Sequence, residues 1–457
     1  MLQATRSAAL VICLLLWADA DGAPPNVVLI ISDDQAWTDF GFMGHEVIRT
    51  PNLDRLARQS VVFERGYVPT SICRPSLASM ITGLYPHQHR IVGNDPSLPT
   101  GKKGKAYYRN PVYRQRNAAL IGNIGRVKTL PRLLARVGYV SHQSGKWWEG
   151  HFSRGGFAEG MTHGDPDRGG RHGDAGLTIG REGMGEVLEF IDRAHDAKKP
   201  FFVWYAPFLP HSPHNPPERL LPRYRAAGRP TELAKYYAMC EWFDESCGEL
   251  LDHLDKRKLN DNTLVVFVID NGWIQRTPAV KVPPGWNVGF APGSKQSPMD
   301  SGLRTPIMLK WPGKLTPRRD RTLVSSIDLA PTILAASGLD VPPEMPGIDL
   351  RKLAAGRKPK RAAIFGELFA HDIADVEDPA RSLLYRWCIE GRWKLIEPED
   401  GVIGRYRAVH AGRSRSPQLY DVVADPFERH DLVEKNPEVV ARLQKRVNDW
   451  WKPASKR

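Results

Sequence analysis

The sequence predicts an α/β fold: a large mixed, mostly parallel sheet with helices on both faces, plus a smaller C-terminal α+β domain with a short antiparallel sheet. Continuous apolar runs at 26–31, 201–205 and 263–269 are typical of parallel strands that are buried on both faces. Helical patterns lie between these runs. Short strand-like segments and one closing helix after residue 355 indicate the second, smaller unit.

The length of 457 residues suits one large domain and a smaller one. Residues 1–20 have the features of a secretory signal peptide: a positive charge at Arg6, an apolar stretch, and a small-x-small cleavage site at 18–20. The main domain is expected at 21–355 and the C-terminal subdomain at 356–457. The apolar stretch is short for a membrane span, which favours an exported, periplasmic or secreted protein without a transmembrane segment over a one-span anchor.

The chain carries a formal net charge of +13 with a sequence pI of about 9.5. An exported basic protein suits an anionic partner such as a sulfated polysaccharide, and the alternative is a solvated basic surface without a specific partner. Nucleic acid is not expected as a partner, because no DNA- or RNA-binding module is visible. The five cysteines do not form a disulfide framework. Cys240 and Cys247 are separated by about 10.5 Å of helical rise, too far for a mutual disulfide, whereas Cys388 could pair with either.

The first strand, at 26–31, is followed by two adjacent carboxylates, Asp33 and Asp34. The most apolar strand, at 263–269, ends in Asp270 and Asn271. Ligands of open α/β sheets bind at the carboxyl ends of the strands, so these oxygens are expected to converge. Carboxylates that repel one another favour a hard cation between them, and the set suits Ca²⁺, with Mg²⁺ possible, better than zinc.

The remaining elements follow from the same patterns. An amphipathic helix at 50–57 precedes a strand at 61–63, and a helix at 130–137 precedes a strand at 139–141. Residues 98–125 are expected to form a long loop, as is the Gly- and His-rich segment 154–182, whose His and Asp spacing matches no metal motif. Further predicted elements are listed here: helices at 185–194, 236–254, 326–332 (with Asp328 as cap) and 437–450; strands at 307–313, 362–368 and 383–396; a linker at 356–361; and a turn at 420–426.

The segment 71–83 contains Cys73 just before Pro75 and a helical pattern at 76–82. Pro suits the first turn of a helix, so Cys73 is expected at or just before a helix N-terminus, where free N–H groups and the helix dipole favour an anion. A nucleophile placed there could meet a sulfate or phosphate ester. The alternative is a buried structural cysteine.

Cys-Arg-Pro-Ser, followed by Thr-Gly-Leu-Tyr-Pro-His, resembles the signature of the formylglycine-dependent sulfatases of the alkaline phosphatase superfamily. The resemblance implies that a maturation enzyme oxidises Cys73 to formylglycine (3-oxoalanine), whose hydrate is the nucleophile and a metal ligand. The chain departs from the family pattern at Leu77, where the family has an Arg that the maturation machinery reads and that steadies the hydrate.

Three further segments are similar to motifs of this family. Gly-Lys-Trp-Trp at 145–148 implies that Lys146 contacts the sulfate, but Trp148 occupies the place of a family His. His151 is a candidate substitute, and a surface histidine without this role is the favoured interpretation. The Pro-His-x-Pro loop at 210–213 places His211 at the leaving group. The segment 295–306 places Lys295 in register as a second sulfate-neutralising lysine.

The resemblance thus implies hydrolysis of sulfate monoesters, on a sulfated carbohydrate, with a divalent cation. Two alternatives stay open from the residues alone: a phosphate or phosphonate ester hydrolase of the same superfamily, and a non-catalytic binder of anionic glycans. The expected catalytic residues are Cys73, His211, Lys146 and Lys295, and the expected metal ligands are Asp33, Asp34, Cys73, Asp270 and Asn271.

Overall fold

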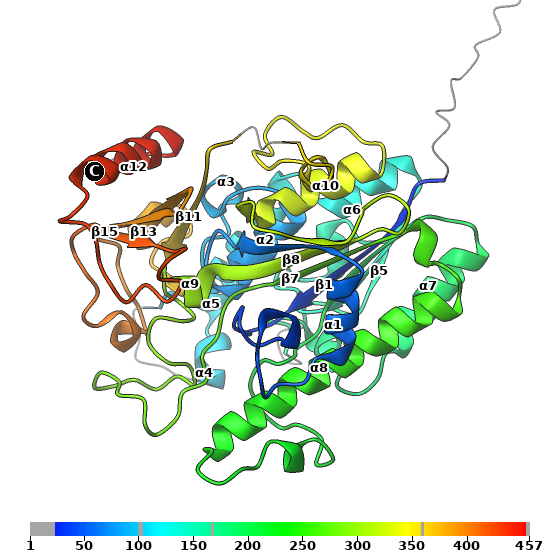
Figure 1. The fold of residues 1–457 in the computed structure, drawn as a ribbon, viewed down its shortest axis with the longest axis horizontal. Helices are drawn as coiled ribbons and strands as arrows, with labels where there is room; N and C mark the ends of the chain where they lie inside the picture. Colours follow the sequence, from blue (N-terminus) through cyan, green and yellow to red (C-terminus); the bar gives the residue numbers. More distant parts are fainter. Residues whose placement is uncertain (1–22, 99–103, 166–168, 358–360, 454–457) are drawn as a thin grey trace, which may run out of the picture.

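The computed structural model describes the chain except for residues 1–22, 99–103, 166–168, 358–360 and 454–457. The expected signal peptide therefore lies outside the described residues, as does the middle of the expected linker. A large sheet with helices above and below it forms most of the molecule, and a small sheet with one covering helix lies at one side (Figure 1).

The large sheet runs in the order β10-β2-β8-β7-β1-β6-β4-β5, with β9 pairing with β2. β8 is antiparallel to both of its neighbours and the other pairings are parallel, so the predicted mixed, mostly parallel sheet is confirmed. Its strands are β1 (Asn26–Ser32), β2 (Val61–Tyr67), β4 (Val140–Gly145), β5 (Glu159–Gly160), β6 (Phe201–Ala206), β7 (Thr263–Ile269), β8 (Arg304–Lys310), β9 (Arg318–Asp320) and β10 (Val324–Ser325).

Helices cover both faces of this sheet, as predicted (Figure 1). In β1, Val27 and Leu29 pack into the core on one face, and Val28 and Ile30 pack into the core on the other. Both faces of the strand are buried away from solvent, which explains why its sequence is a continuous apolar run. The first face carries α2 (Cys73–Thr82), α3 (Pro86–His89), α6 (Leu130–Leu134), α10 (Leu329–Ala336) and α11 (Leu350–Ala354), and the second carries α1 (Pro51–Arg58), α7 (Gly185–Asp196) and α8 (Thr231–Lys256).

The prediction of a long loop at 98–125 was wrong. The described part of this segment contains α4 (Lys105–Tyr108) and α5 (Pro111–Gly122), followed by a 3-10 helix, η2 (Asn123–Arg126). The Asn110 side chain accepts a hydrogen bond from Val112 N at 2.9 Å, and Pro111 occupies the first helical position. Only Tyr113 and Leu120 of α5 are buried, so the helix has no clear apolar periodicity to reveal it.

The C-terminal sheet is antiparallel in the order β11-β13-β14-β15, which confirms the predicted small α+β unit. Its strands are β11 (Ala363–Phe369), β13 (Leu383–Glu390), β14 (Trp393–Pro398) and β15 (Gln418–Asp421). The segment expected as one strand at 383–396 is a hairpin that turns at Gly391, where φ is +59°. α12 (Pro437–Trp450) packs Val439, Leu443 and Val447 against this sheet. The boundary between 355 and 356 stays a prediction.

Two short strands join the two parts: β3 (Asp95–Pro96) pairs in parallel with β12 (Asp372–Ile373). The four cysteines of the described segments, Cys73, Cys240, Cys247 and Cys388, are buried free thiols, so a disulfide to Cys388 is ruled out here. Among the described helices, none combines the length and apolarity that crossing a membrane requires.

Asp328 lies just before α10, as predicted, but its carboxylate does not cap that helix. It accepts hydrogen bonds from Ser325 N at 2.8 Å and from Ile348 N at 2.9 Å, and it also binds the Arg361 guanidinium. The carboxylate therefore ties the start of α10 to two other segments.

Gly145, the last residue of β4, generates a prediction about stability. Its φ is +80°, and a Cβ there would lie 1.8 Å from the carbonyl oxygen of Ala206 on β6. Gly138 has a similar φ of +86° with no atom within 4 Å of its Cβ position, which makes it a matched control. Left-handed backbone costs an alanine about 1–2 kcal/mol at either site, and overpacking adds about 1–3 kcal/mol at Gly145 alone.

We therefore expect Gly145→Ala to lower the free energy of unfolding well beyond Gly138→Ala in urea titrations. Equal losses of unfolding free energy in the two variants would show that the close contact between Gly145 and Ala206 does not constrain this position.

Candidate active site

The carboxyl ends of β1 and β7 bring four polar residues together. The strands pair in register from Asn26 to Ser32, and Asp270 N donates to the carbonyl of Ser32 at 2.9 Å. The pairs that follow the two strands, Asp33–Asp34 and Asp270–Asn271, therefore lie at one edge of the sheet. All four side chains are 2% exposed or less. The predicted convergence of these residues is confirmed.

These four residues contain buried oxygen atoms without a hydrogen-bond partner. Asn271 Nδ2 donates to Asp34 Oδ1 at 2.6 Å, and Asp34 N donates to Asp270 Oδ1 at 3.1 Å. The remaining oxygens, Asp33 Oδ2, Asp34 Oδ2, Asp270 Oδ2 and Asn271 Oδ1, are buried without a hydrogen-bond partner. Unpartnered buried acceptors are costly, and an all-oxygen set of this kind fits a hard divalent cation.

Two lysines face the carboxylates from other parts of the chain. Lys146, directly after β4, places its Nζ 2.7 Å from Asp33 Oδ1 and 3.8 Å from Asp270 Oδ2. Lys295, from the segment before α9 (Asp300–Leu303), contacts Asp34 Oδ1 and lies 3.0 Å from Cys73 Sγ. Burial alone lowers the pKa of both lysines, but the neighbouring carboxylates raise it overall. Both side chains therefore stay protonated and positively charged.

The carboxylates respond unequally to this environment. Burial, together with the charges of Asp270 and Asp34, raises the pKa of Asp33 well above its usual range despite Lys146. Burial also opposes ionisation of Asp34, but Lys295 and His211 lower its pKa overall. Three carboxylates face two ammonium groups here, and this imbalance is the electrostatic reason that a cation fits.

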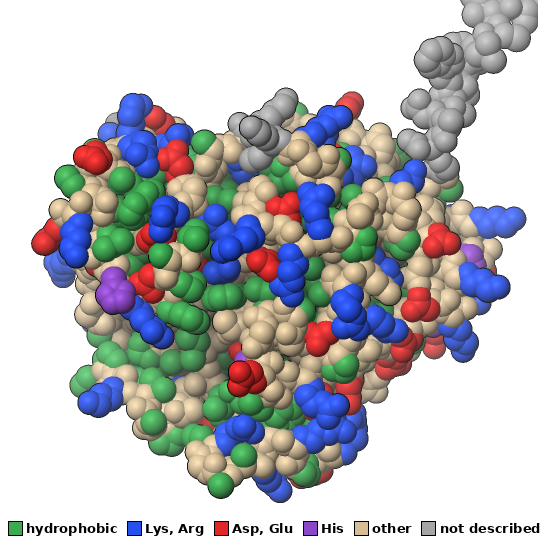
Figure 2. Space-filling model, viewed as in Figure 1, with side chains coloured by type: hydrophobic (Ala, Val, Ile, Leu, Met, Phe, Trp, Pro, Cys, Tyr) green, Lys and Arg blue, Asp and Glu red, His purple; other side chains and the backbone are tan. Residues whose placement is uncertain are grey.

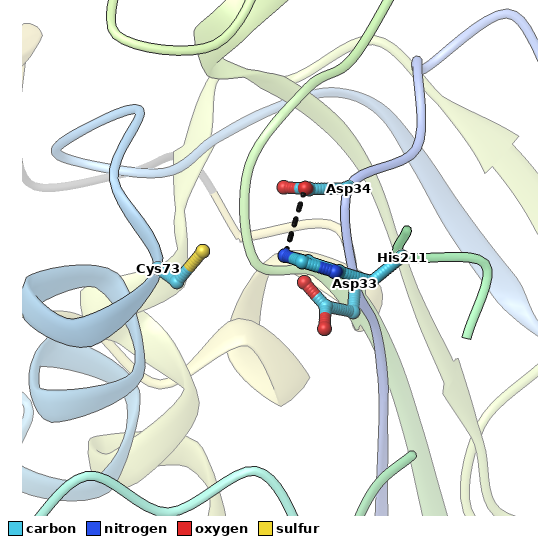
Figure 3. A group of neighbouring side chains, drawn as sticks. All are labelled: Asp33, Asp34, Cys73 and His211. Atoms are coloured by element: carbon cyan, nitrogen blue, oxygen red, sulfur yellow. Dashed lines mark ion pairs between the residues drawn. The ribbon is translucent and has the colours of Figure 1, made fainter. Parts of the chain in front are cut away.

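Cys73 is the first residue of α2 and is 1% exposed, which confirms its predicted place at the helix N-terminus. Its sulfur points from the helix toward Asp33, Asp34 and His211 (Figure 3). One atom from each of these four side chains lies within 4.8 Å of one from every other. Burial raises the pKa of the thiol to about 12, so the unmodified side chain is protonated at neutral pH.

His211 approaches from the loop after β6. The Asp33 amide donates to the carbonyl of Leu209 at 3.0 Å, which holds this loop against the end of β1. His211 Nε2 lies 3.3 Å from Asp34 Oδ2, and its Nδ1 lies 2.5 Å from the carbonyl oxygen of Ser212 (Figure 3). The ring stacks on Phe208 with centroids 4.3 Å apart. Nε2 is therefore the nitrogen directed to the site. Burial lowers the pKa of His211 well below the usual value, although Asp34 opposes this.

The two departures from the family pattern have structural consequences. Leu77 is buried in the core, one turn after Cys73. Trp148 is also buried and lines the pocket that contains Cys73, whereas His151 caps the start of η4 (Phe152–Gly155) and contacts Ser153 Oγ at 2.8 Å. His151 is not among the residues that line the pocket.

His172 is a pocket residue that the sequence did not single out as functional. Its ring centroid lies 5.2 Å from that of Trp148 and 5.4 Å from that of Phe208, and the residue lines the pocket with Cys73. Its Nδ1 is buried without a partner. Burial lowers its pKa well below the usual value, with Arg171 and Lys146 adding to the effect. The Gly- and His-rich composition of 154–182 is the only sequence signal for it.

Arg74 does not reach into the site. Its guanidinium donates twice to Glu149 at 2.8 Å and once to Asn117 on α5 at 2.9 Å, and it is 1% exposed. Losing one partner of a buried pair of this kind leaves an uncompensated charge. Arg74 therefore holds α2, α5 and the segment after β4 together.

The far wall of the pocket comes from segments that are remote in sequence. The cavity has a volume of about 240 Å³, and its lining includes Arg171, His371 and Tyr406. Asp95 accepts from Arg171 Nε at 2.7 Å and from Arg405 Nη2 at 3.1 Å. These arginines neutralise a second buried cluster of acidic groups, Asp95 with Asp372, so its chemistry differs from that of the unpartnered oxygens around Asp33. Sequence spacing gave no signal for this wall.

Two protein-family models match this chain. A family model described as Sulfatase matches residues 25–339, and a second, described as N-sulphoglucosamine sulphohydrolase, C-terminal, matches residues 294–452. The chain is 27% identical over 472 aligned residues to N-acetylgalactosamine-6-sulfatase of Canis lupus familiaris, covering 92% of this chain and 84% of the relative.

Solved structures share the fold. One described as a complex with its substrate D-glucosamine-2-N,6-O-disulfate superposes with a TM-score of 0.69 at 18% identity, covering 95% of this chain and 100% of the other. The phosphonate monoester hydrolase of Agrobacterium radiobacter gives a TM-score of 0.65 at 19% identity, covering 93% and 95%. This fold is therefore shared with a structure described with a sulfated glucosamine substrate and with a phosphonate monoester hydrolase.

The unpartnered oxygens generate a prediction about metal content. Asp270→Ala removes one of these acceptors and one of the three carboxylates, so we expect it to lose most of its bound calcium or magnesium while keeping its fold. Elemental analysis after equilibration with each ion and gel filtration measures this, with circular dichroism as the check on folding. Asp449→Ala, which changes an exposed carboxylate on α12, is the control and keeps wild-type metal content. Equal metal content in Asp270→Ala and wild type contradicts the assignment.

Proposed function

The chain belongs to the sulfatase family, and on that premise we propose that it cleaves sulfate monoesters of a carbohydrate with a nucleophile made from Cys73. It is a sulfuric ester hydrolase. The observation that carries the proposal is the convergence of Cys73, two lysines, a histidine and four unpartnered oxygens at one buried edge of the sheet. Each of these groups matches a requirement of sulfate ester hydrolysis.

The nucleophile in this proposal is formylglycine, formed from Cys73 by a maturation enzyme before catalysis. Its hydrate supplies one hydroxyl to attack sulfur and a second whose deprotonation expels sulfate and restores the aldehyde. The start of α2 suits this role, because its free N–H groups and dipole favour the anionic group that reacts there.

The residues around Cys73 divide the remaining tasks. Lys146 and Lys295 stay charged beside the carboxylates and neutralise the sulfuryl oxygens of the substrate. Asp33, Asp34, Asp270 and Asn271, with the modified Cys73, hold Ca²⁺ or Mg²⁺, which supplies further positive charge to the sulfate group. His211 directs Nε2 into the site, and it gives a proton from Nε2 to the departing sugar oxygen when the ring is the imidazolium, a form that the Asp34 carboxylate and the bound sulfate favour.

Leu77 and Trp148 leave the nucleophile without two groups that the family pattern provides. We assign His172 to face the hydrate in place of the residue missing at Trp148, because its imidazole lies against Trp148 in the pocket wall and has an unpartnered Nδ1. Arg74 does not take the place of the guanidinium at Leu77, because Glu149 holds it. The cation and the two lysines supply the larger electrostatic contribution.

A sulfated carbohydrate is the substrate class that the remaining observations support. N-acetylgalactosamine-6-sulfatase is among the relatives, and a structural neighbour is described with a sulfated glucosamine. The net charge of +13 favours a polyanionic ligand. Export to the periplasm or the outside, with removal of residues 1–20, is part of the same proposal.

Turnover of simple esters tests the reaction class. We expect the metal-loaded enzyme from its native host to hydrolyse an aryl sulfate far faster than the matching aryl phosphate. Cys73→Ala should abolish sulfate turnover, since it removes the only source of the nucleophile. Cys388→Ala, at a buried cysteine of β13, is the control and should keep its turnover.

Predominant phosphatase activity supports a phosphoester hydrolase of the same superfamily instead. Absence of turnover of either ester by metal-loaded, modified protein that still binds sulfated glycans supports a non-catalytic binder.

A further inference from the structure

A second cavity adjoins the active-site pocket. Its volume is about 170 Å³, and it lies between the segment 292–298 that contains Lys295 and the segment 409–413 of the C-terminal part. Lys295 and Gln296 line both cavities, so the two share a wall. On the face drawn in Figure 2, the surface is hollowed and lined with hydrophobic side chains beside the C-terminal sheet. A ligand larger than one sugar can therefore occupy both cavities at once.

Three polar atoms of the residues that line the second cavity are buried and have no hydrogen-bond partner: Gln296 Oε1, His410 Nε2 and Arg413 Nη1. Gln296 is 3% exposed and His410 is 7% exposed. An unsatisfied buried polar group costs about 1–3 kcal/mol, and three such groups on residues around one cavity favour a polar ligand there.

The backbone holds these groups in place. Gln296 has a φ of +61°, and its N–H donates to the carbonyl of Ser71 at 3.0 Å, two residues before Cys73. His410 ends a 3-10 helix, η10 (Arg407–His410), and the Arg413 N–H donates to its carbonyl at 3.4 Å. The cavity is thus fixed relative to the nucleophile.

The charge of the cavity is positive. None of the described residues that line it is Asp or Glu, and Arg413 takes part in no ion pair within the described part of the chain. Burial and the Arg413 charge lower the pKa of His410 to about 4, so its imidazole is neutral. A guanidinium without an ion-pair partner, beside neutral polar groups, selects an anionic group such as a carboxylate or a sulfate.

Aromatic residues complete the cavity. Trp286 and Tyr385 both line it, and the indole N–H of Trp286 already donates to the carbonyl of Phe290 at 3.0 Å. The ring of Trp286 is therefore left to contact a ligand through its apolar surface rather than through its N–H. This combination of aromatic surface and polar groups suits a sugar ring.

We propose that this cavity is a subsite for an anionic substituent, a carboxylate or a second sulfate, on the sugar next to the one whose sulfate ester is cleaved. Arg413 binds the anion, His410 and Gln296 bind hydroxyl groups, and Lys295 lies at the junction with the sulfate site. The inference rests on the proposed function, and it makes the substrate an oligosaccharide rather than a single sugar.

Arg413→Ala tests the subsite, with Arg415→Ala as the matched control, because Arg415 is an exposed arginine two residues further on. Four substrates are compared: an aryl sulfate, and sulfated disaccharides whose neighbouring sugar is neutral, carries a carboxylate, or carries a second sulfate. A charge-assisted hydrogen bond corresponds to about 10- to 100-fold in kcat/KM.

The compared quantity is kcat/KM for a disaccharide divided by kcat/KM for the aryl sulfate. We expect Arg413→Ala to lower this ratio about 10- to 100-fold for an anionic disaccharide. The ratio for the neutral disaccharide should change little, and Arg413→Lys should recover part of the loss. Whichever anionic disaccharide loses more identifies the substituent. Arg415→Ala leaves every ratio at the wild-type value. An unchanged ratio in Arg413→Ala, or equal loss on the neutral disaccharide, overturns the proposal.

Binding separates this inference from the proposed reaction. In a Cys73→Ala background no turnover occurs, and titration calorimetry should show that Arg413→Ala raises the Kd of the anionic disaccharide about 10-fold or more. Lack of aryl sulfate turnover by the wild type, with Arg413-dependent binding retained, refutes the reaction and keeps the subsite. Equal Kd values with and without Arg413 refute the subsite, whatever the turnover.

Discussion

The burial of three carboxylates beside one sulfur atom is the constraint on which the rest of the site depends. The parallel register of β1 and β7 leaves Asp33, Asp34 and Asp270 at one dry edge of the sheet. Isolated charges are costly there, and Lys146 and Lys295 compensate the carboxylates, while the oxygens without a hydrogen-bond partner fit a cation. The lysines, and a cation held by these oxygens, are the positive charge that a sulfate ester needs around its oxygens.

The residues that depart from the family pattern show how one chain keeps this arrangement with different neighbours. Leu77 adds to the hydrophobic core beneath α2, while the adjacent Arg74 is committed to Glu149 and Asn117. The guanidinium in this turn therefore stabilises the join between α2 and the segment after β4. Trp148 fills the pocket wall with apolar surface, and His172 from a separate loop brings an imidazole to the same wall.

Sequence patterns predicted the parts of the site that follow directly from strands. Residues 263–269 match β7 in both bounds, and the polar pairs after two apolar strands meet because parallel strands end together. Residues supplied by loops were not found in this way. Arg171, His371 and Arg405 come together only through long-range packing, and β3 and β12, which carry Asp95 and Asp372, are too short to have a pattern. The sequence did not predict α5, because only Tyr113 and Leu120 of this helix are buried. No local sequence pattern predicts the second cavity, which Arg413 lines.

The mass of the tryptic peptide that contains Cys73, taken from protein made in its native host, tests the central claim most directly. We expect the aldehyde at Cys73 in a fraction of molecules that equals the fraction of active enzyme, and a larger aldehyde fraction in Leu77→Arg made in the same host. An unmodified thiol in wild-type protein that has full sulfatase activity would show that the nucleophile is another group.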